Sequence, residues 1–343
     1  MRKTITKFGI AAAALCLAAS LFLINAQQVD DDLTARRRLF KPIGPGLRAV
    51  RRGSDAKFYV LTSPGSTVSV FDEKGALLKK IPDYSAQSVP PPPPDLRSIQ
   101  FGEDMDVSAN GTVYVADRGA DEIKVWDPAG TARAFRVAAP LSIAALPDGE
   151  VAVATQNSAR LITVYGSTGK VAREMGNPEE LSTRADLNRY LSLGRLASDP
   201  QGRIYYGYTY LPEPLVRQYD RFGFAAGVDF EFTGLDAMSE ARATRREIDR
   251  QDKQQDNKRQ EPPRFPAILT AFGVDPESGE VWMCLHNTLL HFDKDGNRRS
   301  EYQIFTPDGS RLDGTVLLVE EEVLLIGSDP LGVFEFQRPD KKH

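Results

Sequence analysis

One short pattern recurs along the chain. An alternating segment ends in an aromatic residue, which is followed by Asp or Gly, two further residues and Gly. Its copies read VSVFDEKG, IKVWDPAG, ITVYGSTG, VRQYDRFG and LLHFDKDG, and GVFEFQRP is a sixth copy that lacks the Gly. Alternation predicts a strand, and Asp before Gly predicts a tight turn, because Asp accepts backbone hydrogen bonds and Gly adopts positive φ. This repeat constrains the fold more than any other feature.

A second turn lies upstream of each copy. It reads SANGTVYVAD at 108–117, LPDGEVAVAT at 146–155, DPQGRIYYGY at 199–208 and DPESGEVWMCL at 275–285, with related segments at 53–62 and 319–328. Each unit therefore holds four short strands at a spacing of about 40 residues, which predicts an all-β, six-bladed β-propeller. Three connections are enlarged, at 83–100 (with the proline run 90–94), 177–194 and 231–268.

The clearest copy also supports a family resemblance. MDVSANGTVYVADRGADEIKVWDPAG, residues 105–130, resembles an NHL-type repeat, and the array resembles six-bladed propellers of the NHL-repeat and gluconolactonase-like type. The resemblance covers nearly all of 36–337. It implies a propeller whose loops gather at one mouth of a central channel. Such folds host binding modules and several unrelated enzymes, so the fold alone does not define the function.

The repeat also sets the expected boundaries. Residues 36–340 are expected to form the propeller, with blades near 44–82, 101–138, 139–176, 194–232, 268–306 and 312–337. The last blade lacks a fourth strand, and RRRLFKPI at 36–43 has no blade of its own, so this segment is predicted to close the last blade. The charged segment 231–268 predicts a helical or disordered insertion between blades 4 and 5, with a solvated run over 251–260.

The N-terminus indicates export. Residues 1–26 combine basic residues, an apolar run over 8–24 and a cleavage-like Ile24-Asn25-Ala26, which predicts a signal peptide followed by a linker over 27–35. We expect a periplasmic or extracellular protein. An uncleaved inner-membrane anchor is the alternative, because the run approaches the length that spans a bilayer, and membrane contact is expected only in that case.

Charge and cysteine content narrow the partners. The full chain of 343 residues has a net charge of −4, and loss of residues 1–26 leaves 40 basic against 47 acidic residues. This balance does not indicate a nucleic-acid partner. Only Cys284 would remain, so no internal disulfide can form, and its apolar surroundings predict a buried thiol. We expect a monomer.

Candidate ligand-binding residues follow the second strand of most blades. The set comprises Asp117, Arg118, Asn157, Tyr208, His286, Asn287 and Asp329, together with Arg264 from the segment that enters blade 5. A ring of such donors and acceptors would suit a small polar ligand or a protein partner. The alternative is that side chains such as Asp117 only bond loop backbone.

No catalytic motif stands out. The chain has three histidines and no pair at equivalent positions of two blades, which excludes a three-His zinc site. G-x-S-x-G, H-E-x-x-H and phosphate-binding glycine loops do not occur. The gluconolactonase-like resemblance implies a cation held by acid and amide groups, for which Glu103, Asp104, Asn157 and Asn287 are candidates compatible with Ca²⁺ or Mg²⁺. No register places them together, and no cofactor is otherwise predicted.

Two functions remain open. The absence of a catalytic motif favours an exported, non-catalytic binding or scaffold propeller that uses its loop-rich channel face. The alternative is a divalent-cation-dependent hydrolase or lyase of the gluconolactonase-like kind.

Overall fold

The structure is a computed structural model that describes residues 32–41, 43–63, 67–82, 98–233, 239–253 and 265–341. The predicted signal peptide, the first part of the 27–35 linker, the proline run at 90–94 and Arg264 lie outside these residues. Of the helices within them, none is long and apolar enough to cross a membrane.

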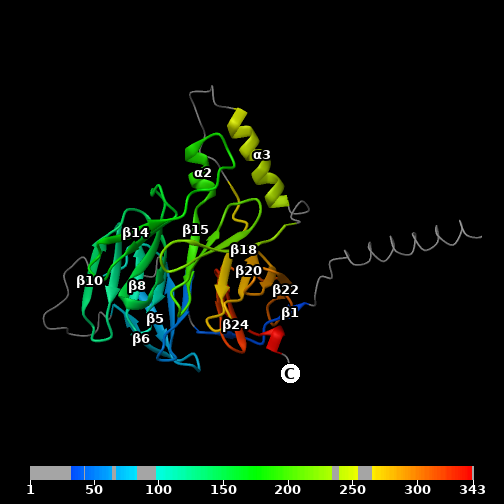
Figure 1. Cartoon of the computed structure of the whole chain (residues 1–343). Helices are drawn as coiled ribbons and strands as arrows, with labels where there is room; N and C mark the ends of the chain where they lie inside the picture. Colours follow the sequence, from blue (N-terminus) through cyan, green and yellow to red (C-terminus); the bar gives the residue numbers. More distant parts are fainter. Residues whose placement is uncertain are drawn as a thin grey trace, which may run out of the picture.

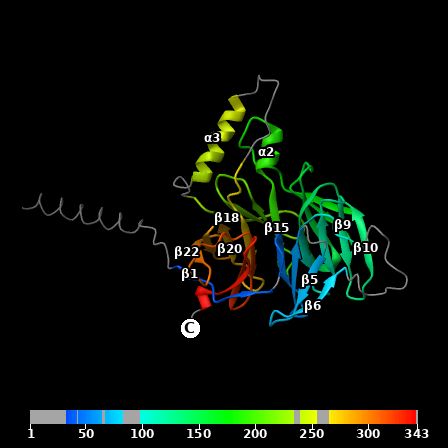
Figure 2. The same cartoon turned by 180° about the vertical axis from the view of Figure 1, so that it is seen from behind.

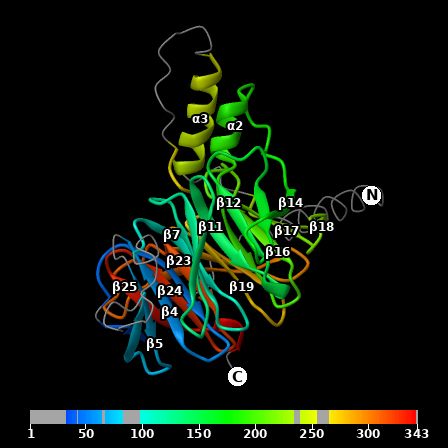
Figure 3. The ribbon, with the colours of Figure 1, turned by 90° about the vertical axis from the view of Figure 1, so that its left-hand side faces the viewer.

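The described residues form six sheets arranged in a ring, in which the first strand of each blade contacts the first strand of the next (Figures 1 and 3). Blade 1 contains β3 (Leu47–Arg52), β4 (Phe58–Thr62), β5 (Thr67–Phe71) and β6 (Leu77–Ile81). Blade 2 contains β7 (Gly102–Val107), β8 (Val113–Asp117), β9 (Glu122–Trp126) and β10 (Ala132–Arg136). Blade 3 contains β11 (Pro140–Ala145), β12 (Val151–Thr155), β13 (Ile162–Tyr165) and β14 (Val171–Met175).

The second half of the ring has the same order. Blade 4 contains β15 (Gly194–Ser198), β16 (Ile204–Tyr208), β17 (Leu215–Tyr219) and β18 (Ala225–Glu231). Blade 5 contains β19 (Ala271–Val274), β20 (Val281–Leu285), β21 (Thr288–Phe292) and β22 (Arg298–Phe305). Blade 6 contains β23 (Val316–Val319), β24 (Val323–Ser328) and β25 (Gly332–Gln337). The predicted all-β, six-bladed propeller is confirmed.

The ring closes through the N-terminal segment. β2 (Arg37–Leu39) pairs antiparallel with β25 and is the outer strand of blade 6, as the sequence predicted. Leu39 and Phe40 are buried between blades 6 and 1, and Phe40 packs against Phe58 and Phe71 at centroid distances of 5.2 and 4.9 Å. Closure therefore removes an open sheet edge and buries apolar area at the joint.

The structure differs from the sequence expectation just before this strand. Leu33 and Thr34 fall in the predicted linker, yet they form β1 (Leu33–Thr34), a parallel addition to β22 of blade 5 (Figure 2). Leu33 is buried there with Ile304, which explains why the segment pairs although it lacks an alternating pattern. The N-terminal segment thus joins two blades.

The repeated turn residues are structural. The Asp72 carboxylate accepts hydrogen bonds from the N–H groups of Lys74 and Ala76 at 3.0 and 2.7 Å, and Gly75 has a φ of 84°. The Asp127 carboxylate likewise accepts a hydrogen bond from the N–H of Thr131 in its own turn. These residues recur because the turn needs a local acceptor and a residue that tolerates positive φ.

Two helices extend from one side of the ring and lie beside each other in all three views (Figures 1–3). They are α2 (Ala185–Leu191), in the enlarged connection between blades 3 and 4, and α3 (Ser239–Lys253), in the insertion between blades 4 and 5. Arg184 Nη1 donates to Gln251 Oε1 at 2.9 Å, and the Thr183 hydroxyl donates to Asp252 at 3.3 Å. These two enlarged connections therefore gather on one side, whereas most of the third, 83–100, lies outside the described residues.

The insertion is more ordered than its composition suggests. α3 buries Ala241, Thr244, Ile248 and Gln251, which recur every three or four residues along one face. Gln251 was expected to begin a solvated run. It is buried instead, because the segment before α2 supplies hydrogen-bond partners for its amide. The remaining turns of the fold include the short 3-10 segments Pro147–Gly149 and Pro339–Lys341.

Candidate functional site

Asp117 is buried and bonded within the loops of blade 2. Its carboxylate is fully buried, accepts hydrogen bonds from the N–H groups of Gln100 and Phe101 at 2.9 and 2.8 Å, and pairs with the buried ammonium of Lys124 at 2.9 Å. It fixes the entry into β7 by holding the loop backbone, in agreement with the alternative stated from the sequence.

Tyr208 is also buried. Its hydroxyl donates to Glu179 Oε1 at 3.2 Å and accepts from Arg217 Nη1 at 3.3 Å, and Arg217 pairs in turn with Asp229 at 2.8 Å. Burial raises the pKa of the Tyr208 phenol well above its usual value. The group joins blades 3 and 4: Tyr208 belongs to their core, whereas Glu179, Arg217 and Asp229 are partly exposed and line a surface groove outside the channel.

The remaining predicted ligand residues lie in separate loops. His286 has its Nε2 3.0 Å from the carbonyl oxygen of Ala267, and the Asn287 amide donates to Gln303 at 2.6 Å within blade 5. Asp329 is exposed and accepts the N–H of Gly46 at 2.6 Å, which ties blade 6 to blade 1. Asn157 is exposed in the loop after β12. Within the described ranges, no hydrogen bond or ion pair joins these side chains to one another.

The candidate cation ligands are divided between different structures. Asp104 is buried, and its carboxylate accepts from Arg51 at 3.2 Å and from the hydroxyl of Ser142 at 2.5 Å. Glu103 is the bulged neighbour of Asp104 in β7 and pairs with Arg118 at 2.9 Å. Asn287 bonds within blade 5, far along the ring. Only Glu103 and Asp104 come from one strand.

A belt of polar groups crosses the inner strands of blades 1 to 4. Arg51 of β3 donates to Asp104 of β7, Ser142 of β11 donates to the same carboxylate, and the N–H of Leu196 in β15 donates to the Ser142 hydroxyl at 2.9 Å. Arg51 Nε also lies 3.4 Å from Asp106. This belt satisfies the buried carboxylate and couples four blades.

A small cavity lies at the end of the channel where the inner strands begin. Arg48, Arg51, Asp104 and Arg195 line it, with mostly apolar residues of β15, β19 and β23 opposite. It leaves about 20 Å³ for the centres of water molecules, which is room for one or two waters. An organic ligand would therefore contact these arginines from the loop side. We call this place the channel mouth.

Arginine charge at the channel mouth is incompletely neutralised. Glu103 lies 2.9 Å from Arg118 and 3.8 Å from Arg48, so one carboxylate serves two guanidinium groups. Arg48 Nε is buried and has no hydrogen-bond partner, and the guanidinium lies 5.2 Å from the centroid of the Phe101 ring. Among the described residues, Arg195 has no carboxylate within ion-pair distance. The mouth is thus electropositive.

Aromatic residues stand next to these charges. Tyr190 packs against Tyr210 at 5.1 Å and against Phe265 at 5.7 Å between ring centroids. Burial raises the pKa of the Tyr210 phenol, and the positive charge of Arg195 opposes this rise. The rings come from α2, from the loop after β16 and from the segment that enters blade 5.

Sequence reasoning missed Arg48 and Arg195, which are the second residues of β3 and β15. Their shared position in the repeat, as the second residue of an inner strand, is the signal that could have identified them. Arg48 and Glu103 occupy the same place in β3 and β7, because each is the second residue of its strand and is a bulge residue without a partner in the next strand. The residues predicted from the sequence lie instead in the loops after the second strands.

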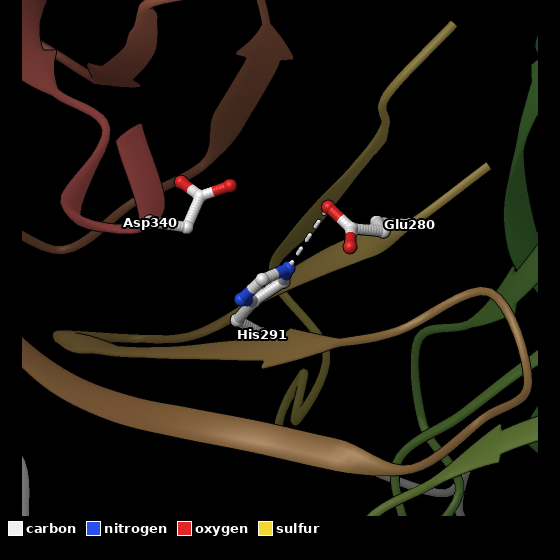
Figure 4. Close-up of side chains that lie close together, drawn as sticks. All are labelled: Glu280, His291 and Asp340. Atoms are coloured by element: carbon white, nitrogen blue, oxygen red, sulfur yellow. Dashed lines mark ion pairs between the residues drawn. The ribbon is translucent and has the colours of Figure 1, made fainter. Parts of the chain in front are cut away.

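A second polar cluster lies between blades 5 and 6 (Figure 4). His291 Nε2 is 3.4 Å from Glu280 Oε2, and the ligand atoms of Glu280, His291 and Asp340 lie within 4.8 Å of one another. Arg338 is fully buried and contacts Asp275 and Asp340 at 2.6 Å each and Glu280 at 3.5 Å. The Arg338 guanidinium thus supplies the positive charge that a metal ion would otherwise bring to these carboxylates. The cluster is a latch that holds the C-terminal segment on blade 5.

Comparisons with known proteins support the fold. No family model matches the chain, and a search of curated proteins finds no match. Among solved structures, a streptogramin B lyase is similar with a TM-score of 0.53 and 14% identity, over 88% of this chain and 86% of that chain. Virginiamycin B lyase from Staphylococcus aureus is similar with a TM-score of 0.50 and 13% identity, over 88% and 87%.

A catalytically inactive form of the same lyase with quinupristin is similar with a TM-score of 0.50 and 11% identity, over 89% of this chain and 88% of that chain. Identities this low show the fold alone. Together with the six sheets described above, they define the chain as a six-bladed β-propeller.

Proposed function

We propose that the protein is an exported, non-catalytic binding propeller that takes a small carboxylate-bearing ligand at the channel mouth. The observation that carries this proposal is Arg195, a half-buried guanidinium without a carboxylate partner in the described residues, in the same cavity lining as Arg48. A planar guanidinium matches a carboxylate with two parallel hydrogen bonds. The blades are proposed to be repeats of the NHL type.

The surroundings of Arg195 suit such a ligand. The pocket wall is apolar on the side of β19 and β23, which strengthens an ion pair by excluding water. Tyr190 and Tyr210 are only partly buried, and an apolar part of the ligand is proposed to pack against their rings. Glu103, shared between Arg118 and Arg48, keeps both guanidinium groups near the mouth and would release one of them to a competing anion.

The nucleophile candidates support a non-catalytic role. Cys284 is buried, and burial raises the pKa of its thiol to about 12, which leaves almost no thiolate at neutral pH. His286 is held against the carbonyl of Ala267, and His291 lies in the latch between blades 5 and 6. The apolar run at 8–24 supports export, to the periplasm or the cell exterior.

A divalent-cation-dependent hydrolase or lyase is the second candidate. It is favoured by the fold of the similar structures, which are lyases by their own description, and by Glu103 at the mouth. A cation bound by Glu103 would have to displace Arg118, and the neighbouring Asp104 is already bonded by Arg51 and Ser142.

Calorimetric titration of the full chain with benzoate, citrate and neutral benzamide tests the proposal. We expect the carboxylates to bind and benzamide not to bind. Arg195→Gln should weaken the carboxylates about tenfold or more, as expected for loss of a charge-assisted bidentate contact. Arg221→Gln is the matched control, because Arg221 lies on an exposed turn paired with Asp148.

Two results would count against the proposal. One is equal binding of benzoate and benzamide, and the other is an unchanged affinity in Arg195→Gln. A rise in melting temperature with Ca²⁺ or Mg²⁺ that is lost in Glu103→Gln would favour the cation-dependent enzyme instead.

A further inference from the structure

A second concave surface lies on the outer rim, between the closing strand and the connection that follows blade 5. Arg36, Arg37, Arg38 and Lys41 line one side, and the segment with Asp308 and Ser310 lines the other. The groove has a volume of about 570 Å³, within the usual range for small-ligand sites. We call it the rim groove. It shares no lining residue with the channel mouth.

The rim groove carries uncompensated positive charge. Arg37 is neutralised by Glu335 through two hydrogen bonds of 3.2 and 2.7 Å. Arg36, Arg38 and Lys41 are exposed, and no carboxylate of the described residues lies within ion-pair distance of them. The one carboxylate in the lining, Asp308, already accepts the Thr306 hydroxyl and the Ser310 N–H.

The backbone positions these cations. Arg38 lies in β2, and Arg36 directly precedes this strand with its N–H bonded to the carbonyl oxygen of Glu335, so the backbone of both residues is fixed beside β25 and both side chains line the rim groove. Arg38 rests over Gly332, where a Cβ atom would lie 2.7 Å from its Nε. Glycine at 332, with a φ of 109°, thus leaves room for the guanidinium beside β25. The arrangement is a pair of planar donors followed by the ammonium of Lys41.

We propose that the rim groove binds phosphate esters. A phosphate ester dianion carries three oxygens outside the ester bond, and two guanidinium forks plus one ammonium can satisfy its charge and its acceptors together. The ester could belong to a soluble metabolite or to a phospholipid whose headgroup is itself a phosphate monoester, such as phosphatidic acid, and the chemistry recognised is then the same. The channel mouth and the rim groove use different arginines, so a ligand at one site does not exclude a ligand at the other.

The N-terminal sequence gives the lipid source a physical basis. The apolar run at 8–24 ends nine residues before Leu33, the first residue of β1. Nine residues span at most about 32 Å when extended. A chain that retained this run in a bilayer would therefore hold the rim groove within reach of the headgroups.

The test uses the full chain held in lipid nanodiscs of phosphatidylcholine, with glycerol 3-phosphate as the probe and glycerol as the neutral control. Calorimetry should show binding of glycerol 3-phosphate and none of glycerol. The variant Arg36→Gln/Arg38→Gln/Lys41→Gln should lower the affinity at least tenfold. The matched control Lys74→Gln/Lys79→Gln/Lys80→Gln removes the same charge from exposed positions of blade 1 and should bind like the wild type.

A second arm identifies the source. In discs that contain phosphatidic acid, a several-fold weaker affinity for glycerol 3-phosphate means that headgroups occupy the groove. An unchanged affinity means that the groove serves a soluble ester. Melting curves of each variant check that the fold is retained.

Three outcomes would overturn the proposal: no binding of glycerol 3-phosphate by the wild type, equal weakening by both triple variants, or loss of binding in Arg195→Gln. The last outcome would place phosphate at the channel mouth. Retained phosphate binding in Arg195→Gln with lost benzoate binding would show that the two sites are independent, so each proposal can fail without the other.

Discussion

Replacing Phe40 tests whether the N-terminal segment is a structural part of the ring. Phe40 is 2% exposed and packs between Phe58 and Phe71 at the joint of blades 6 and 1. Truncating a buried Phe to Ala typically costs about 3–5 kcal/mol, because contacts are lost and a cavity remains. Phe40→Ala should therefore lower the melting temperature of the full chain by roughly 5–10 °C.

The backbone at this position allows a sharper comparison. Phe40 has a φ of 52°, a region in which a Cβ atom costs about 1–2 kcal/mol and glycine is unstrained. Phe40→Gly should then be about 0.5–1 kcal/mol more stable than Phe40→Ala, the reverse of the usual order. Urea unfolding curves measure both differences.

The matched control is Phe222→Ala, since the Phe222 side chain is 68% exposed on a turn of blade 4. Its unfolding free energy should change by less than about 0.5 kcal/mol. The reasoning is refuted if Phe40→Ala costs less than about 1 kcal/mol, or if Phe222→Ala costs as much. The first result would mean that the closing segment is only loosely attached, and the second that burial at the joint does not set the cost of removing Phe40.

Three further predictions concern buried groups. Asp117→Ala should destabilise the fold by about 3–5 kcal/mol in urea unfolding, because it leaves the ammonium of Lys124 buried without its partner, and an effect under 1 kcal/mol would contradict this. Burial lowers the pKa of His291 more than Glu280 and Asp340 raise it, so below about pH 6.5 the unfolded chain takes up a proton that the folded chain does not. Stability should fall from pH 7 toward pH 5, and His291→Gln should flatten this slope. Cys284 should remain unmodified by maleimide in peptide maps of the native protein and react only after unfolding.

The repeat predicted the fold because it reflects local rules. A turn that ends in Gly needs a residue tolerant of positive φ, and Gly75 and Gly130 meet that need with φ of 84° and 87°. The spacing of these turns fixes four strands per unit and six units. The unpaired closing strand followed from the same count, since the last blade had three strands of its own.

The functional surface was harder to predict, because its members depend on contacts between blades. Asp117 looked like a ligand from its place after a strand, and only its contact with Lys124 and the backbone of Gln100 and Phe101 shows it to be structural. Tyr208 turned inward for a similar reason, with Arg217 beside it. Arg195 drew no attention, because a guanidinium without a carboxylate partner has no sequence signature.

The sequence by itself therefore determined the number of blades, the turns between strands and the need for a closing strand, because these depend on neighbours a few residues apart. Only the tertiary structure decided which polar groups are neutralised. Arg338 bonds to Asp275, 63 residues earlier, and Arg51 of blade 1 bonds to Asp104 of blade 2. Partners so distant in the chain meet only when neighbouring blades pack against each other, and the charges left without partners at the channel mouth and the rim groove are what remain after those pairings are made.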